Sequence, residues 1–140
     1  VDMTETLQLT PQDAFGRDFG TSVDIEDNLI AVSDPGTANA KFFLFEKTCA
    51  NWTSDPEIAV LSPTSGSTSY DFGADIIIHG DLIAVGEPSH DKGYVYLFNK
   101  PAEGWTDMAP EDTLSFSGPL TNSTLGRSID VCDAYIVAGR

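Results

Sequence analysis

The sequence predicts an all-β protein built from repeated four-stranded units. Three observations support this: a motif that recurs at a fixed spacing, short apolar runs rich in β-branched residues, and no long apolar stripe of helical period. The motif appears as Phe19-Gly20, Phe72-Gly73 and Leu125-Gly126, at intervals of 53 residues. At the same spacing and without a gap, Leu29–Val32 recurs as Leu82–Val85. The repeat therefore defines the organisation of the chain.

The second unit shows the four predicted strands most clearly. In chain order these segments are Phe72–Ile78, Leu82–Val85, Tyr94–Phe98 and Trp105–Phe116. The first is rich in isoleucine and ends in a tight turn at His79–Asp81. The third alternates aromatic and aliphatic residues, as a strand packed on both faces does, whereas the fourth is more polar. We expect an antiparallel order in which the first strand is innermost, with the acidic residues mostly in turns and outer strands.

The repeat divides the chain into complete and partial units. We predict the end, or outer strand, of a preceding four-stranded unit at 1–17. Full repeats follow at 18–70 and 71–123, and the truncated start of a third repeat at 124–140. Links rich in Gly, Ser, Thr and Pro precede the second and third units. Loop residues of this kind commonly separate β-units.

Four-stranded units that recur every 40–55 residues are typical of β-propeller blades, which pack face to face around a channel. The chain then supplies about two and a half blades, too few to close a ring. We therefore expect a fragment of a longer polypeptide. Ring closure by oligomerisation is the alternative.

A series of motifs within each unit indicates a family. The second unit carries Phe72-Gly73, Gly80-Asp81, Gly86–Pro88, Gly93–Phe98 and Trp105 in register. A degraded form occurs in the first unit, as Phe19-Gly20, Asp27-Asn28, Ser33–Pro35, Phe42–Phe45 and Trp52. This series resembles the FG-GAP repeat of integrin α-subunit propellers, in its short-loop version. The resemblance implies a non-catalytic extracellular or cell-surface module for adhesion or ligand recognition. The alternative is a structural building block of an extracellular filament or matrix assembly.

The turns between the first two strands depart from the calcium-binding form of that family, which has an Asp-rich loop there. In this chain the turns are only Glu26–Asn28, His79–Asp81 and Cys132-Asp133. They offer one or two carboxylates each, whereas Ca²⁺ takes six to eight oxygen ligands. The short turns therefore do not support Ca²⁺, and we predict no metal or cofactor.

Acidic residues replace the alanine of the family's Gly-Ala-Pro motif at Asp34 and Glu87. One interpretation is a hydrogen-bonded turn former before proline. The other is an acidic ring on one rim of the propeller, which holds a cation or a basic partner. His90 and Asp91 follow on the long loop between the second and third strands. These four residues are the candidate binding residues of the rim loops.

The two cysteines are predicted not to pair with each other. Cys49 precedes a fourth strand, and Cys132 lies in the first turn of a unit two blades later. A disulfide requires Cα atoms within about 7 Å, which blades so far apart do not allow. Each cysteine is then free or bonded to residues outside this chain.

Two N-glycosylation sequons lie in predicted surface turns or links, Asn51-Trp52-Thr53 and Asn122-Ser123-Thr124. Asn122 is the better candidate, because the central tryptophan makes Asn51 a weaker acceptor.

Composition excludes several functions. Seven Lys and Arg against 22 Asp and Glu give a net charge of -15, which disfavours nucleic acid and anionic membranes. No apolar run approaches the roughly 20 residues of a membrane helix. No catalytic motif such as Gly-x-Ser-x-Gly or His-Glu-x-x-His occurs, so no enzyme is predicted. The expected partners are the remainder of the propeller or other protein subunits, with an extracellular protein as ligand.

Overall fold

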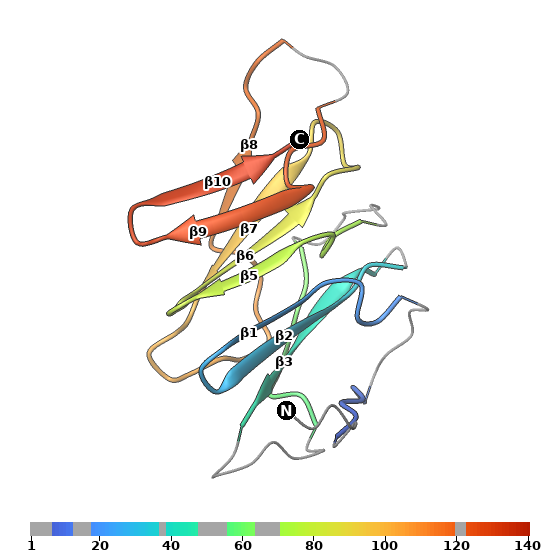
Figure 1. Ribbon diagram of the computed structural model, residues 1–140, viewed down its shortest axis with the longest axis vertical. Coiled ribbons are helices and arrows are strands. Elements are labelled where there is room, and N and C mark those ends of the chain that lie inside the picture. The colour runs from blue at the N-terminus through green and yellow to red at the C-terminus, as the bar shows by residue number, and fades with distance from the viewer. Residues whose placement is uncertain (1–6, 13–17, 37–38, 48–55, 64–70, 120–122) are drawn as a thin grey trace, which may run out of the picture.

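Three antiparallel β-sheets make up the structure, a computed structural model that describes residues 7–12, 18–36, 39–47, 56–63, 71–119 and 123–140 (Figure 1). The all-β prediction is confirmed, because the described residues contain no helix. The first sheet has the order β1 (Val23–Glu26), β2 (Leu29–Asp34), β3 (Lys41–Glu46) and β4 (Ala59–Leu61). The second has the order β5 (Ile76–His79), β6 (Leu82–Glu87), β7 (Tyr94–Asn99) and β8 (Asp112–Ser115). The third pairs β9 (Ser128–Cys132) with β10 (Tyr135–Gly139).

The Phe-Gly motif forms a turn that precedes the first strand of each sheet instead of being part of it. Its glycines, Gly20, Gly73 and Gly126, have φ values of +92°, +91° and +91°. Glycine adopts this conformation without steric cost. Each glycine N–H donates to a backbone carbonyl at the far end of the adjacent strand, over 2.8, 2.9 and 3.0 Å. All three units therefore begin with the same backbone geometry, at the spacing that the sequence shows.

The three sheets follow one another side by side, and their first strands carry the contact between them (Figure 1). Strand β5 contacts β1 and β2 of the first sheet. Strand β9 contacts β5 and β6 of the second sheet in the same way. Both junctions between sheets therefore have the same arrangement.

An aromatic cluster fills the junction between the first and second sheets. Phe72, from the Phe-Gly turn, is fully buried, with its ring centroid 5.4 Å from that of Tyr96 and 6.1 Å from that of Phe42. Phe98 lies 5.2 Å from Phe42 in an edge-to-face arrangement, which aromatic pairs prefer. The aromatic residues of the third strands thus form a core between sheets.

The far face of the first sheet is covered by a segment that is not a strand. Leu9 and Phe19 pack against buried Val32, Phe43 and Phe45. We predicted the outer strand of a preceding blade at 1–17, but residues 7–12, the part of this range that the structure describes in full, are not in a strand. Leu9 of this segment nevertheless packs on the apolar side chains of this face.

Candidate functional site

Three of the four predicted rim residues lie together at the loop between β6 and β7. Glu87 ends β6, His90 and Asp91 lie in the loop, and Tyr94 begins β7 opposite Glu87. The Glu87 side chain is fully buried, whereas 40% of the His90 side chain is exposed. The loop therefore presents the histidine to solvent above a carboxylate that solvent does not reach.

The Glu87 carboxylate connects two rings. Its Oε2 accepts a hydrogen bond from the Tyr96 hydroxyl at 2.6 Å and lies 3.1 Å from His90 Nδ1. Burial raises the pKa of Tyr96 well above its usual value, and the neighbouring Glu87 carboxylate raises it further. The phenol therefore stays protonated and remains a donor to Glu87 at neutral pH. The His90 ring also lies 5.2 Å from the ring of Tyr94.

The shape of this loop is held by local contacts and by the third unit. Asp91 has φ of +52°, a left-handed conformation that aspartate tolerates better than most residues, and its carboxylate lies 3.5 Å from the Tyr94 hydroxyl. The Ser89 hydroxyl donates to the Asp71 carboxylate. Gly93, at φ of +83°, forms a parallel bridge with Leu125, and a Cβ atom there would lie 2.3 Å from the Leu125 backbone nitrogen. Glycine is required at this position because two backbones meet.

Asp34 occupies the equivalent position in the first sheet, at the end of β2 and opposite Lys41. Like Glu87 it is buried. An acidic ring on the rim requires carboxylates that face solvent, and these two do not. Glu87 bonds instead to Tyr96 and lies beside His90, so the role of these carboxylates as turn formers before proline stays a prediction.

A small pocket opens on the same rim and is shared by all three units. Its volume is about 240 Å³, and it is lined by Thr21, Pro35, Asp71, Ala74, Pro88 and Arg127. Arg127 is exposed and forms no ion pair within the described part of the chain. The pocket thus combines two prolines with one cationic and one acidic side chain, Arg127 and Asp71.

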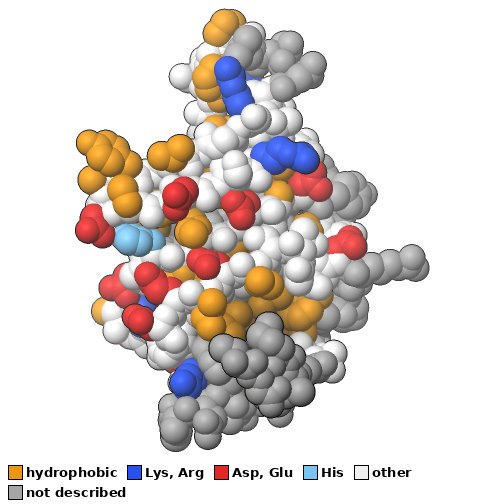
Figure 2. Space-filling model, in the orientation of Figure 1, with side chains coloured by type: hydrophobic (Ala, Val, Ile, Leu, Met, Phe, Trp, Pro, Cys, Tyr) orange, Lys and Arg blue, Asp and Glu red, His pale blue; other side chains and the backbone are white. Residues whose placement is uncertain are grey.

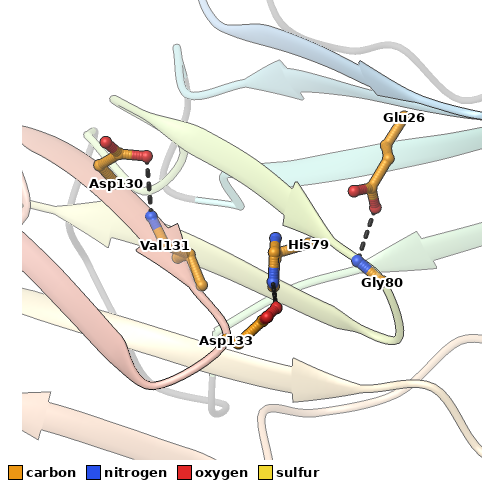
Figure 3. A network of polar contacts seen from close by, with 6 residues as sticks. All are labelled: Glu26, His79, Gly80, Asp130, Val131 and Asp133. Carbon is orange, nitrogen blue, oxygen red and sulfur yellow. Dashed lines mark hydrogen bonds and ion pairs between the residues drawn. The ribbon is translucent and has the colours of Figure 1, made fainter.

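The turns on the opposite edge of the sheets are two-residue hairpins. The loop residues are Asp27-Asn28, Gly80-Asp81 and Asp133-Ala134. The Glu26 carboxylate beside the first turn accepts a hydrogen bond from Gly80 N–H at 2.6 Å (Figure 3). Across the described residues, no three His, Cys, Asp or Glu side chains form a group that could hold a metal ion.

Carboxylates on the innermost strands form a series of contacts that sequence reasoning missed. Asp24 Oδ2 accepts from Ile78 N–H at 2.6 Å, and Asp75 Oδ2 accepts from Ile129 N–H at 2.6 Å. Each pair is 54 residues apart, which is one repeat plus one residue. The expectation that acidic residues occupy mostly turns and outer strands is therefore wrong for these positions. The sequence signal that could have indicated a role for these carboxylates was the spacing of Asp24 and Asp130, which are two repeats apart.

A similar contact joins the turns of the second and third units. His79 Nε2 lies 2.8 Å from Asp133 Oδ1, again 54 residues away (Figure 3). His79 replaces Glu26 of the first unit, so a ring nitrogen takes the place of a carboxylate at the equivalent position. This histidine is used between sheets, not in the rim loop.

Several predicted residues lie outside the described part of the chain, namely Asn51, Asn122 and Cys49. Their glycosylation and pairing therefore stay predictions. Cys132 is exposed at the end of β9 and forms no disulfide within the described residues.

No protein-family model matches the chain, and no curated protein matches its sequence. The structure itself defines the class: an all-β repeat protein whose antiparallel sheets pack laterally through their first strands. Among the described residues, no helix is long and apolar enough to cross a membrane.

Proposed function

We propose that this chain is part of an FG-GAP-type β-propeller that recognises a protein ligand, as a non-catalytic module outside the cell or at its surface. In this proposal the sheets are blades, and the chain supplies about two and a half blades of a seven-bladed ring. The expected partners are the rest of the propeller or other subunits, and an extracellular protein ligand. Location outside the cell is supported by the family resemblance and by the two sequons.

The observation that carries the proposal is the repeated lateral junction. Phe72 follows the first sheet and Leu125 follows the second, and each precedes a glycine with the same positive φ. At each junction a carboxylate then accepts a hydrogen bond from a backbone N–H of the next sheet, one repeat plus one residue further along the chain. Face-to-face packing with an identical step between units is what a propeller requires. A repeat of this kind also brings loops from successive units onto one rim, where ligands of many repeat proteins bind.

The rim pocket and the Glu87–His90 loop are the proposed recognition surface. In a chain of net charge -15, the exposed Arg127 is an uncommon positive group. Its guanidinium in a pocket lined by two prolines can hydrogen-bond an acidic side chain or a carbonyl group of a protein partner, with the Asp71 carboxylate on the same pocket wall. The buried Glu87 holds His90 in place at the edge of this surface.

The experiment is a binding screen of the 140-residue chain against a panel of purified extracellular protein domains, read by surface plasmon resonance. At least one binder should lose tenfold or more in affinity with Arg127→Glu. The matched control is Lys100→Glu, which makes the same charge change in the loop after β7, on the opposite edge. Binding that the two variants weaken equally, or a panel without a binder, would overturn the proposed recognition surface.

The second candidate function is a structural building block of an extracellular assembly. The observation that favours it is the presence of exposed apolar side chains on both outermost sheets, including Val23 and Tyr135. Filament formation by a chain that binds nothing in the panel would select this function.

A further inference from the structure

The two histidines of the chain are held through different ring nitrogens. His90 uses Nδ1, which lies 3.1 Å from Oε2 of Glu87, whereas His79 uses Nε2, which lies 2.8 Å from Oδ1 of Asp133. The two acids also differ in burial, because the Glu87 side chain is fully buried and the Asp133 side chain is 99% exposed. Water therefore competes with His79 for Asp133, but it does not reach the carboxylate that holds His90.

The contact with Glu87 decides which nitrogen of His90 carries the proton. Glu87 Oε2 also accepts a hydrogen bond from the Tyr96 hydroxyl at 2.6 Å. An ionised carboxylate has only acceptor sites, so the ring nitrogen that faces it must be a donor. In a neutral imidazole one nitrogen is a donor and the other is an acceptor. The neutral ring of His90 is therefore the Nδ1–H form, and its Nε2 carries the lone pair.

Three contacts hold this ring in one orientation. Nδ1 is bound to Glu87, the ring centroid lies 5.2 Å from that of Tyr94, and the His90 carbonyl accepts from Gly93 N–H at 2.8 Å. Nε2 has no hydrogen-bond partner among the described residues and is not buried, so solvent reaches it. The loop between β6 and β7 thus presents a fixed, unused acceptor at the surface.

We propose that His90 is the hydrogen-bond acceptor of the recognition surface, and that its Nε2 takes an N–H or O–H donor of the protein ligand. This inference rests on the proposed function, since it names the chemistry that the ligand offers at the loop between β6 and β7. Arg127 supplies donors to the same surface. The ligand therefore carries an acceptor for Arg127 and a donor for His90.

The charge of the molecule favours a donor at this position. The chain has a net charge of -15, and Asp and Glu side chains are spread more widely than Lys and Arg over the face drawn in Figure 2. A donor presents the positive end of its bond dipole, which the field of an acidic protein attracts. A carboxylate bound to one ring nitrogen also raises the basicity of the other. Both effects strengthen a hydrogen bond that Nε2 accepts.

The proton position can be measured without a ligand. Heteronuclear NMR of the imidazole nitrogens distinguishes the two neutral forms in mildly alkaline buffer, where histidine side chains are ordinarily neutral. The His90 ring should have a protonated Nδ1 and an unprotonated Nε2. The His79 ring should show the reverse, because its Nε2 faces Asp133, and His79→Asn assigns the signals by removing one set. A proton on Nε2 of His90 would overturn the inference, whatever binds the surface.

The affinity for a binder from the panel of extracellular domains tests the acceptor itself. His90→Asn keeps an N–H group near the position of Nδ1 but has no acceptor at the position of Nε2. It should weaken binding about tenfold, because the donor of the ligand is left without a partner. The matched control is His79→Asn, the same substitution on the opposite edge, which should leave the affinity unchanged. Circular dichroism should show the same fold for both variants.

The outcomes separate this inference from the proposed function. A binder that is weakened by Arg127→Glu but not by His90→Asn would overturn the inference and leave the recognition surface in place. A panel without a binder would overturn the recognition surface, and with it the donor assigned to the ligand. The NMR measurement would still show whether His90 is an acceptor.

Discussion

The two junctions between sheets are both bridged by a carboxylate near a first strand, at different positions of the repeat, and they are filled very differently. Between the first and second sheets, buried Phe42, Phe72 and Phe98 form one aromatic cluster, and the groove at the turn edge is only about 170 Å³. Between the second and third sheets, smaller buried residues such as Ala84 and Val95 take this role.

The closeness of the backbones differs in the opposite sense, because the junction with the smaller side chains has the closer backbones. At the first junction, a Cβ atom added to Gly73 would lie 2.7 Å from the Ser33 side chain. At the second, the equivalent pair is Gly86 and Gly126, and a Cβ on Gly86 would lie 1.8 Å from the Gly126 carbonyl oxygen. The second junction is thus closer at the backbone and lined by smaller buried side chains. The repeat dictates where the sheets meet, while the side chains decide how tightly each junction is stabilised.

The largest expected effect is at the aromatic cluster. Phe72→Ala should lower the free energy of unfolding by about 3–5 kcal/mol, because a fully buried ring leaves a cavity. The matched change at the other junction, Leu125→Ala, should cost clearly less, since Leu125 is only partly buried. Urea unfolding followed by tryptophan fluorescence provides both values. Equal losses would contradict the difference between the junctions.

The next effect concerns the backbone contact. Gly126→Ala should cost several kcal/mol, because its Cβ would lie 2.4 Å from the Tyr94 carbonyl oxygen in addition to the strain of a positive φ. Gly20→Ala isolates the strain alone, since Gly20 has nearly the same φ and no atom within 4 Å of its Cβ position. That control should cost about 1–2 kcal/mol. Similar losses for both variants would show that the close approach is unimportant.

The lateral hydrogen bonds should have a smaller effect. Asp75→Ala removes the acceptor for Ile129 N–H and should destabilise the chain by about 1.5–3 kcal/mol, as expected for a charged hydrogen bond. Amide hydrogen exchange should speed up at Ile129 in this variant. Asp130→Ala is the control, because Asp130 has no partner in the next sheet among the described residues and its loss should leave exchange at Ile129 unchanged. Unchanged protection of Ile129 in Asp75→Ala would argue against the contact.

The smallest expected effect is at Tyr96 and depends on pH. The folded-state pKa of Tyr96 is raised above its usual value near 10, mainly by burial. Above pH 10 the unfolded chain therefore loses this proton while the folded chain keeps it, so stability falls as pH rises. Tyr96→Phe should cost about 1–2 kcal/mol at pH 7, since it removes the hydrogen bond to buried Glu87.

The pH series separates this titration from general alkaline denaturation. Between pH 9 and 11 the stability of Tyr96→Phe should fall less steeply than that of the wild type. The control is Tyr135→Phe, which changes an exposed tyrosine and should keep the wild-type slope. Parallel slopes for wild type and Tyr96→Phe would contradict the raised pKa.

Much of the fold could be predicted because its information is local and repeated. Alternating apolar residues in Tyr94–Phe98 and the turn at Gly80-Asp81 predicted strands and hairpins that the structure contains. The predicted fourth strand from Trp105 was too long, because Trp105 packs against the core outside any strand and regular pairing covers only Asp112–Ser115. Side-chain packing overrides strand propensity there.

The candidate site was less predictable. His90 and Asp91 were found as loop residues, but the burial of Glu87 under the hydroxyl of Tyr96 depends on how β6 pairs with β7. Arg127 reaches the rim pocket only because the third unit packs against the second. Neither contact has a signature in the local sequence.

By itself, the sequence determined the period of the repeat, the order of the strands within a unit and the glycines of the Phe-Gly turns. These features depend on backbone preference and on apolar alternation, which act between near neighbours. Only the tertiary structure decided that Asp24 and Asp75 bond to the adjacent sheet and that Asp34 and Glu87 are buried. Those outcomes depend on residues about one repeat away or on an adjacent strand, and such residues come within hydrogen-bond distance only after the sheets have formed and packed.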